Sequence, residues 1–221
     1  NPTSAIGSDG TYSITAVITD TVGNVGSPSS AISYQLDSAN NAPTATLQSV
    51  TSTGFVVSAS DTDVQPDWNS LSIDSGSISL SSSAGGSTAV NNGSNTTFTV
   101  SEQVGFAFNA LTVSDGVASA VAVTDNGTGV SLAVGSAFGE NIGANDTLVN
   151  ISYGFDGADN MLGGSQSDYL FGGAEGDTLR GRGGDDELTG GSGADTFQFE
   201  SASNGLDTIK DFDDSQSDIL D

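Results

Sequence analysis

The sequence contains no cysteine and no histidine among its 221 residues. Without cysteine there is no disulfide bond and no thiolate nucleophile. Without histidine there is no His-based metal site, no zincin motif and no Ser-His-Asp triad. A G-x-S-x-G nucleophile elbow and a phosphate-binding glycine loop are also missing. We therefore predict that the chain is not an enzyme.

Positive charge is almost as scarce. Lysine and arginine together number 3 against 28 aspartates and glutamates, which gives a formal net charge of -25. The three cations are Arg180, Arg182 and Lys210, so residues 1–179 carry none. Binding to nucleic acids or to anionic membrane surfaces needs cationic side chains, so both partners are excluded. The partners that such a chain favours are themselves cations.

Long apolar runs are missing as well. No segment approaches the roughly 18 apolar residues of a transmembrane helix, so we expect no direct membrane insertion. The first residues, NPTSAIGSDG, lack the charged start and the apolar core of a signal peptide. Because the chain also stops abruptly at SDILD, we interpret it as a piece of a longer protein, whose full architecture and oligomeric state stay open.

The residues that are present favour an all-β fold in three parts, because 35% of them are hydrophobic and β-branched stretches recur. Residues 1–38 contain two alternating stretches around a turn-rich segment, which predicts a hairpin. Tyr12 follows SDGT and resembles the tyrosine corner of an immunoglobulin-like domain. We interpret this part as strands of a truncated or shared immunoglobulin-like domain, with an ordinary exposed hairpin as the alternative.

Residues 42–135 hold short strands at regular spacing, the pattern of an antiparallel β-sandwich of about seven strands. The stretch SASDTDVQPDWNSLSI at 58–73 resembles the calcium-binding loop of cadherin-like modules in large bacterial surface proteins. The resemblance implies that Asp61, Asp63 and Asp67 bind at least one calcium ion. A solvated acidic turn is the alternative. Trp68 is expected to pack or to cover the loop, with a ligand platform as the alternative.

Residues 139–221 contain five nonapeptides in unbroken register from 154 to 198. Position 1 is always glycine, position 6 is always aspartate and position 8 is always a large apolar residue. The position-6 aspartates are Asp159, Asp168, Asp177, Asp186 and Asp195. The position-8 residues are Met161, Leu170, Leu179, Leu188 and Phe197.

The repeat resembles the RTX family of secreted calcium-binding nonapeptides, G-G-x-G-x-D-x-U-x. Each unit holds a six-residue turn and a three-residue strand, and two units form one coil of a parallel β-roll that repeats every eighteen residues. Glycine supplies the positive φ angles that tight turns need. The glycines of the calcium loops are Gly154, Gly157, Gly163, Gly164, Gly172, Gly173, Gly181, Gly184, Gly190, Gly191 and Gly193.

Stacked turns of such a roll form cages of oxygen atoms, which calcium fits best. The register pairs Asp159 with Asp177, Asp168 with Asp186 and Asp177 with Asp195, which gives three complete sites. Degenerate units at 141–149 and 202–210 extend the number to five, by pairing Asp146 with Asp168 and Asp186 with Asp207. The family pattern is broken by Phe155 and Arg182 at position 2 and by Gln166 and Glu175 at position 4, so we expect weaker binding at the turns of Gln166 and Glu175.

Between residues 154 and 198 nine acidic side chains face only two arginines, so calcium binding is expected to supply the folding free energy of the roll. The resemblance implies folding outside the cell after type I secretion from a Gram-negative bacterium. The order of hairpin, sandwich and roll resembles the C-terminal region of RTX adhesins. It implies calcium-dependent cell adhesion and biofilm formation at the cell surface, with a peptide or a carbohydrate on another cell as the ligand. A purely structural folding and spacing module and the RTX tail of a secreted hydrolase are the alternatives.

Overall fold

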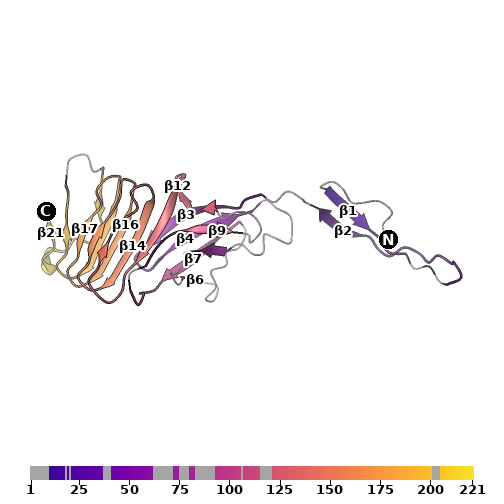
Figure 1. Cartoon of the computed structure of the whole chain (residues 1–221), viewed down its shortest axis with the longest axis horizontal. Helices are drawn as coiled ribbons and strands as arrows, with labels where there is room; N and C mark the ends of the chain where they lie inside the picture. The colour runs from indigo at the N-terminus through magenta and orange to yellow at the C-terminus, as the bar shows by residue number, and fades with distance from the viewer. Residues whose placement is uncertain are drawn as a thin grey trace.

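In the computed structural model, the regular elements among the described residues are almost all β-strands (Figure 1). It describes residues 10–17, 19, 21–36, 41–61, 72–74, 80–82, 93–105, 107–114, 121–200 and 205–221. The one helical element in this part of the chain is a short 3-10 turn, η2 (Asp214–Gln216). No helix among the described residues is long and apolar enough to span a membrane.

Near the N-terminus, β1 (Gly10–Ile14) and β2 (Ile32–Leu36) form an antiparallel sheet of two strands. Tyr12 of β1 lies opposite Tyr34 of β2. The strands fall where the sequence predicts a hairpin, and the immunoglobulin-like assignment stays a prediction.

Two sheets make up residues 41–134, which we call the two-sheet region. The strands are β3 (Thr44–Thr51), β4 (Gly54–Ser60), β5 (Ser72–Asp74), β6 (Leu80–Ser82), β7 (Ser94–Val100), β8 (Ala107–Ala110), β9 (Thr112–Ser114), β10 (Val121–Ala122), β11 (Thr124–Asp125) and β12 (Thr128–Val134). One sheet has the order β10-β9-β5, and β6-β7-β4-β3-β11 belong to the other. Their facing side chains form one apolar core.

Alternation of apolar and polar residues places the core-facing side chains of the two-sheet region. In β4 the buried residues are Phe55, Val57 and Ala59, two positions apart, as the period of a half-buried strand requires. The ring of Phe55 stacks on that of Phe98 from β7, with 5.4 Å between the ring centroids. Pairs of this kind stabilise a sheet beyond the area they bury.

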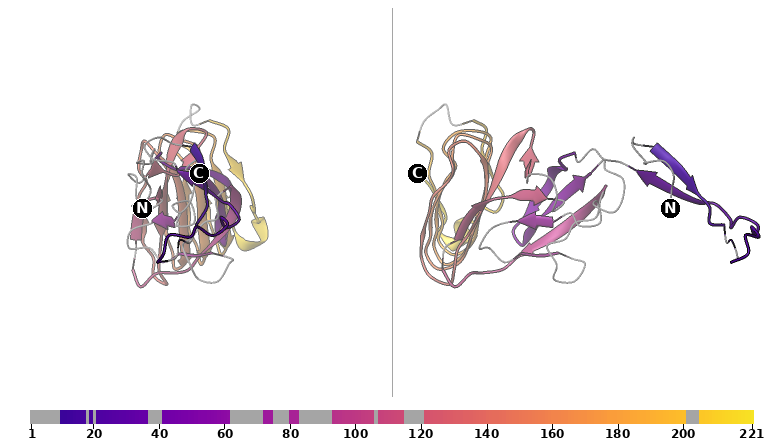
Figure 2. Two further views of the ribbon diagram at one scale, coloured as in Figure 1. Left: turned by 90° about the vertical axis from the view of Figure 1, so that its right-hand side faces the viewer. Right: turned by 45° about the vertical axis from the view of Figure 1, so that its right-hand side comes forward.

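The remaining strands wind into a parallel β-roll. They are β13 (Asn141–Ile142), β14 (Val149–Asp156), β15 (Asn160–Leu162), β16 (Tyr169–Ala174), β17 (Thr178–Arg180), β18 (Glu187–Ser192), β19 (Thr196–Phe197), β20 (Thr208–Ile209) and β21 (Ile219–Leu220). One parallel sheet has the order β12-β14-β16-β18-β20, and the other has the order β13-β15-β17-β19-β21. The right-hand view of Figure 2 shows the coils as nested loops.

The eighteen-residue coil expected from the sequence is confirmed by the strand register. Tyr169 lies opposite Glu187 in one sheet, and Thr178 lies opposite Thr196 in the other. Each strand of the five repeats contributes one fully buried apolar side chain to the interior. These side chains are Met161, Leu179 and Phe197 from one sheet and Leu170 and Leu188 from the other, as the register predicts.

The roll and the two-sheet region share a sheet and a core. β12 pairs in parallel with β14 of the roll and antiparallel with β11 and β8 of the two-sheet region. Ile151 and Tyr153 of β14 are buried in the same cluster as Phe55 and Val57. The Tyr153 hydroxyl donates a hydrogen bond of 2.9 Å to the carbonyl oxygen of Thr51. The two parts are therefore joined by continuous β-structure, where the sequence suggests separate domains at 42–135 and 139–221.

Candidate metal centre

The position-6 aspartates of the five repeats form two buried ladders along the roll. Each is at most 3% exposed. The Oδ1 atom of Asp177 accepts the backbone N–H of Asp159, and Oδ1 of Asp195 accepts that of Asp177, both at 2.8 Å. In the second ladder, Oδ1 of Asp186 accepts the N–H of Asp168 at 2.8 Å. The structure thus brings together the three aspartate pairs expected from the sequence.

The second carboxylate oxygen has no such partner in four of these residues. The Oδ2 atoms of Asp159, Asp177, Asp186 and Asp195 are buried and accept no hydrogen bond. A buried oxygen without a partner carries the full cost of its desolvation, on the order of 1–3 kcal/mol and more when it is charged. A bound cation removes that cost, so these oxygens mark where a cation fits.

Backbone oxygens converge on the same places. A Cβ atom added to Gly154 would lie 2.2 Å from Oδ2 of Asp159 and 2.3 Å from the carbonyl oxygen of Gly172, one coil further on. At Gly172 the corresponding distances are 2.3 Å to Asp177 Oδ2 and 2.5 Å to the carbonyl of Gly190. Only glycine fits at position 1, because a side chain would fill the space that these oxygens face. Carboxylate and carbonyl oxygens are the ligands that calcium prefers.

Burial perturbs the ionisation of the ladder. It raises the pKa of Asp177 and Asp186 to about 7 and the pKa of Asp159 and Asp168 to about 6. At Asp177 the backbone N–H of Asp159 opposes this rise, and the charges of Asp159 and Asp195 add to it. Burial also raises the pKa of Asp195. The ionised carboxylates that calcium binds are therefore unfavourable in the folded roll without a cation.

Four of the five turns have a left-handed backbone at positions 2 and 4. Gly157, Gly173, Gly184, Gly191 and Gly193 have φ angles between 104° and 142°. Three other residues at these positions adopt the same region, namely Phe155 (77°), Glu175 (72°) and Arg182 (76°). Each costs on the order of 1–2 kcal/mol relative to glycine, and the roll tolerates all three.

The turn that contains Gln166 is built differently. Gln166 is not among the left-handed residues, and the backbone N–H of Gly164 donates to Oδ2 of Asp168. Oδ1 of Asp168 accepts from both the backbone and the side-chain amide of Asn150, at 2.7 and 2.9 Å. Both oxygens of Asp168 are therefore satisfied within the protein. This agrees with the weaker calcium binding expected at the turn of Gln166, whereas weaker binding at the turn of Glu175 stays a prediction.

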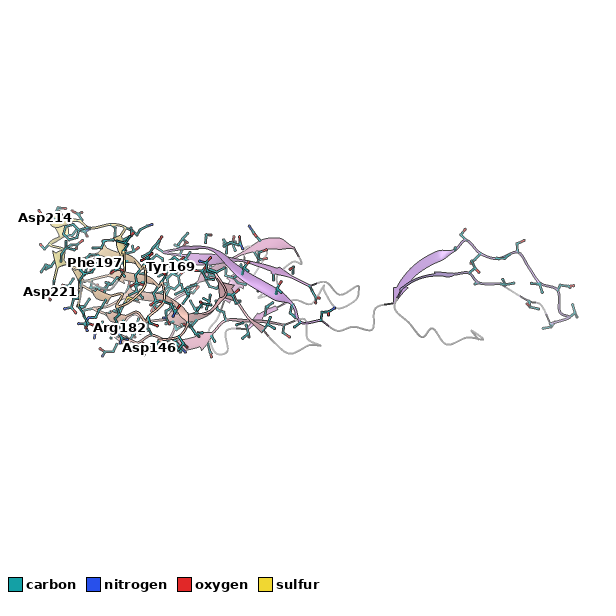
Figure 3. The ribbon with its side chains drawn as sticks, turned by 90° about the horizontal axis from the view of Figure 1, so that it is seen from above. Asp146, Tyr169, Arg182, Phe197, Asp214 and Asp221 are labelled. Carbon is teal, nitrogen blue, oxygen red and sulfur yellow. The ribbon has the colours of Figure 1, made fainter. Side chains whose placement is uncertain are left out.

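The expected pair of Asp146 with Asp168 is wrong. β14 begins at Val149 and places Asn150, eighteen residues before Asp168, at the ladder position. This register puts Ile151 and Tyr153 of the same strand into the apolar core of the two-sheet region. The side chain of Asp146 is exposed and instead forms an ion pair of 2.9 Å with Arg182, both labelled in Figure 3.

The ladder of Asp159 extends one coil before the five repeats, to Glu140, which lies inside the roll predicted at 139–221. The backbone N–H of Glu140 donates to Oδ1 of Asp159 at 2.7 Å, so Glu140 occupies the ladder position before Asp159. Its carboxylate accepts from the backbone N–H and the hydroxyl of Ser136. The signal is present at 135–142, where Gly135, Glu140 and Ile142 stand at positions 1, 6 and 8 of a nonapeptide with glutamate in place of aspartate.

At the C-terminal end, each ladder has one further aspartate. The sequence predicts Asp207 in one ladder but does not predict Asp218 in the other. Oδ1 of Asp207 accepts the N–H of Asp186 at 3.1 Å, as the sequence predicts. Oδ1 of Asp218 accepts the N–H of Asp195 at 3.0 Å, while its Oδ2 accepts from Asp213. Asp218 is followed two residues later by an apolar residue, as in the repeats. Its distance of 23 residues from Asp195 in place of 18 hides the match.

The predicted calcium loop of the two-sheet region is only partly visible. Asp61 follows β4 and is buried, whereas Asp63, Asp67 and Trp68 lie outside the described residues. Among the residues that the structure describes, no group of three or more acidic side chains converges on one point. Calcium binding at Asp61, Asp63 and Asp67 therefore stays a prediction.

The geometry agrees with the comparison to known families. The family model of the RTX calcium-binding nonapeptide repeat, in four copies, matches residues 153–175 and 171–200. Residues 153–200 therefore carry RTX calcium-binding nonapeptide repeats, and proteins with such repeats are typically secreted. No curated protein and no solved structure gives a significant match to the chain.

Proposed function

We propose that the chain is a calcium-dependent adhesion module of a bacterial surface protein. In this role a Gram-negative cell exports it by type I secretion, and outside the cell it attaches to a peptide or a carbohydrate on another cell and promotes biofilm formation. The observation that carries the proposal is the union of the calcium roll with the two-sheet region through one sheet and one core. Calcium that orders the roll also fixes the surface that the neighbouring region presents.

The ladder provides a switch that responds to the calcium concentration. Extracellular calcium modules bind at roughly 0.1 to 1 mM, far above the calcium level of a cytosol. At low calcium, four of the five buried repeat aspartates, Asp159, Asp177, Asp186 and Asp195, have neither a cation nor a hydrogen-bond partner for Oδ2. Because the binding free energy is then the folding free energy, the roll is expected to form only after export.

Strand β14 links the switch to the adhesive part. Its residues Asn150 and Ser152 are buried on the side of the roll, and Asn150 is held by Asp168 of the next coil. Ile151 and Tyr153, which alternate with them, are buried in the core of the two-sheet region. When the roll orders β14, the strand therefore also completes the core of the two-sheet region.

The same union favours a second function, that of a purely structural spacer. A continuous sheet that runs from β20 to β6 carries load between neighbouring domains without any ligand. The two functions differ in one property, because only an adhesion module attaches to a surface once it is folded.

Attachment of the whole chain to surfaces separates these functions. Beads coated with residues 1–221 are offered to bacterial and host cells in calcium and in EGTA. Wild-type beads are expected to attach in calcium only, and Asp177→Asn is expected to reduce attachment. Asp156→Asn removes the same charge from an exposed position and serves as the control. If beads carrying the folded, calcium-loaded chain attach to no cell, the chain is a spacer.

A further inference from the structure

The outer face of the sheet β12-β14-β16-β18 changes character along the roll. On β14 the outward residues Ile151 and Tyr153 are buried against the two-sheet region. On β16 the outward residues Tyr169 and Phe171 are half-buried, and on β18 the outward residues are Glu187 and Thr189. The boundary between the covered and the open part of this face therefore lies over β16.

A hollow of about 410 Å³ lies at this boundary. Its walls include Phe155 and Phe171 on the roll and Ser52 from the turn between β3 and β4. Its far rim holds Thr189, Ser192 and Asp211. The hollow thus combines aromatic walls with a rim of hydroxyl groups and one carboxylate.

An aromatic ladder ends at the hollow. The rings of Tyr153 and Phe171, on adjacent strands, stack with 5.0 Å between centroids and 10° between planes. The neighbour of Phe171 on the following strand is Thr189, so the stack does not continue onto β18. The side chain of Thr189 is smaller than an aromatic ring, and both Thr189 and Phe171 line the hollow.

The glycines of the hollow have a different origin. A Cβ atom on Gly173 would lie 2.0 Å from the carbonyl oxygen of Phe155, and one on Gly191 would lie 2.1 Å from that of Gly173. Their absence of side chains is imposed by the backbone and says nothing about a ligand. No such constraint acts on Thr189, which stands in a regular strand with an outward side chain.

The residues around the hollow limit the class of ligand that it can bind. No lysine or arginine lines the hollow, and the chain carries a net charge of -25, so anionic ligands are disfavoured. Asp211 is held by the backbone N–H groups of Gly190 and Gly191, at 2.9 and 2.8 Å, and its carboxylate retains capacity to accept from hydroxyl groups. A neutral ring with one apolar face and a rim of hydroxyls matches both the aromatic wall and the polar edge.

We propose that this hollow binds a pyranose ring of a neutral saccharide, stacked on Phe171 with its hydroxyls directed to Asp211, Thr189 and Ser192. The inference rests on the proposed adhesive function, because it names the class of ligand that the module attaches to. It places the ligand at the junction of roll and two-sheet region, where calcium-driven folding of the roll builds the wall.

The test uses the whole calcium-loaded chain and saturation-transfer NMR with methyl glycosides of glucose, mannose, galactose and N-acetylglucosamine. At least one is expected to receive saturation from the protein, and glucuronic acid, an anionic control, is not. Thr189→Phe places an aromatic ring beside Phe171 and is expected to abolish the signal while the melting temperature stays at or above that of the wild type. Thr178→Phe, the same change on the opposite sheet, is expected to leave the signal intact.

Three results overturn the proposal. The first is that the folded wild type transfers saturation to none of the pyranosides. The second is that Thr189→Phe transfers saturation as strongly as the wild type. The third is saturation transfer to phenylalanine amide in place of the sugars, which indicates a site for a peptide side chain. Bead attachment measured in parallel separates this proposal from the adhesive function. Cell attachment that persists when no sugar binds refutes the saccharide site alone, whereas loss of attachment in Asp177→Asn supports the adhesive role independently.

Discussion

The roll and the two-sheet region bury their side chains by opposite means. The two-sheet region closes over a wide apolar cluster that includes Phe55, Phe98 and Leu132. Within the five repeats, the interior of the roll is a narrow row with one apolar side chain per strand, flanked by ladders of buried aspartates. A hydrophobic core stabilises the first, whereas the second needs a cation for the oxygens that its own groups leave unpaired. β14 belongs to both, and through it the calcium requirement of one region reaches the other.

The largest loss of stability is expected when a calcium ligand is removed from the roll. Asp177→Asn removes the central carboxylate of a ladder, which faces Asp159 on one side and Asp195 on the other. Loss of one partner from a buried charged site costs about 3 kcal/mol or more. The free energy of unfolding in saturating calcium and the number of calcium ions bound should therefore both decrease. Denaturant unfolding and calorimetric titration measure the two.

The control and a further comparison sharpen this prediction. Asp156→Asn, at an exposed position, should change neither quantity measurably. Asp159→Asn should reduce the stoichiometry by less than Asp177→Asn, because Glu140 on its other side is hydrogen-bonded to Ser136. Equal losses at Asp159 and Asp177 would contradict the pairing.

A slightly smaller effect is expected from the core that the two regions share. Ile151 is fully buried, and Ile151→Ala should lower the unfolding free energy by about 2–5 kcal/mol. Because the strand is common to both regions, the roll and the two-sheet region should lose stability together in saturating calcium. Val57→Ala changes the same core from β4, a strand that does not belong to the roll, and should lower the calcium affinity less than Ile151→Ala does. Thermal unfolding with calcium titration distinguishes them.

Acid should act on the calcium-free roll in the direction opposite to its effect on most proteins. The folded state raises the pKa of Asp177 and Asp186 to about 7, from about 4 in an unfolded chain. The folded roll therefore binds protons more tightly than the unfolded chain. This stabilisation is fully present below about pH 4 and is lost as the pH rises through about 7.

Circular dichroism in EGTA between pH 8 and pH 4 measures this dependence. Residual roll structure should grow as the pH falls, whereas in calcium it should weaken because protons compete with the ion for the same carboxylates. An EGTA sample whose signal does not change with pH would show that the buried aspartates do not control folding.

The smallest effect is expected at the turn that departs from the others. Asp168 accepts hydrogen bonds at both carboxylate oxygens. Asp168→Asn should therefore remove one hydrogen bond and lower the unfolding free energy by about 1 kcal/mol. The number of calcium ions bound should change little. The calorimetric stoichiometry of Asp168→Asn should stay closer to that of the wild type than that of Asp177→Asn. A loss as large as that of Asp177→Asn would mean that the turn rearranges around an ion.

The sequence alone predicts the roll between residues 154 and 198, and the reason is local. In an unbroken repeat each side chain has the same neighbours one coil away, so a single register fixes the columns of Leu170 and Leu188 and the ladder of Asp177. Glycine at position 1 is equally readable, because the oxygens of Asp159 and Gly172 leave no space for a Cβ at Gly154.

The register at the ends of the roll cannot be predicted from the repeat pattern. Asp146, Thr147 and Leu148 imitate positions 6 to 8 of a repeat, yet Asn150 holds position 6, so the register lies four residues later. What decides the register is the fit of Ile151 and Tyr153 into a core built largely by distant strands. Such long-range pairing leaves no periodic signal in the segment itself. The same holds for β12, whose two partnerships join regions that the sequence separates.

Hydrogen exchange of the ladder amides tests the central claim most directly. The backbone N–H groups of Asp159, Asp168 and Asp177 donate to carboxylates one coil further on. In calcium at pH 7.5 these amides should exchange slowly, at rates set by global unfolding of the roll. In EGTA at the same pH they should exchange as fast as in an unfolded chain. Equal protection with and without calcium would contradict the account, because the roll would then be held by its apolar core alone.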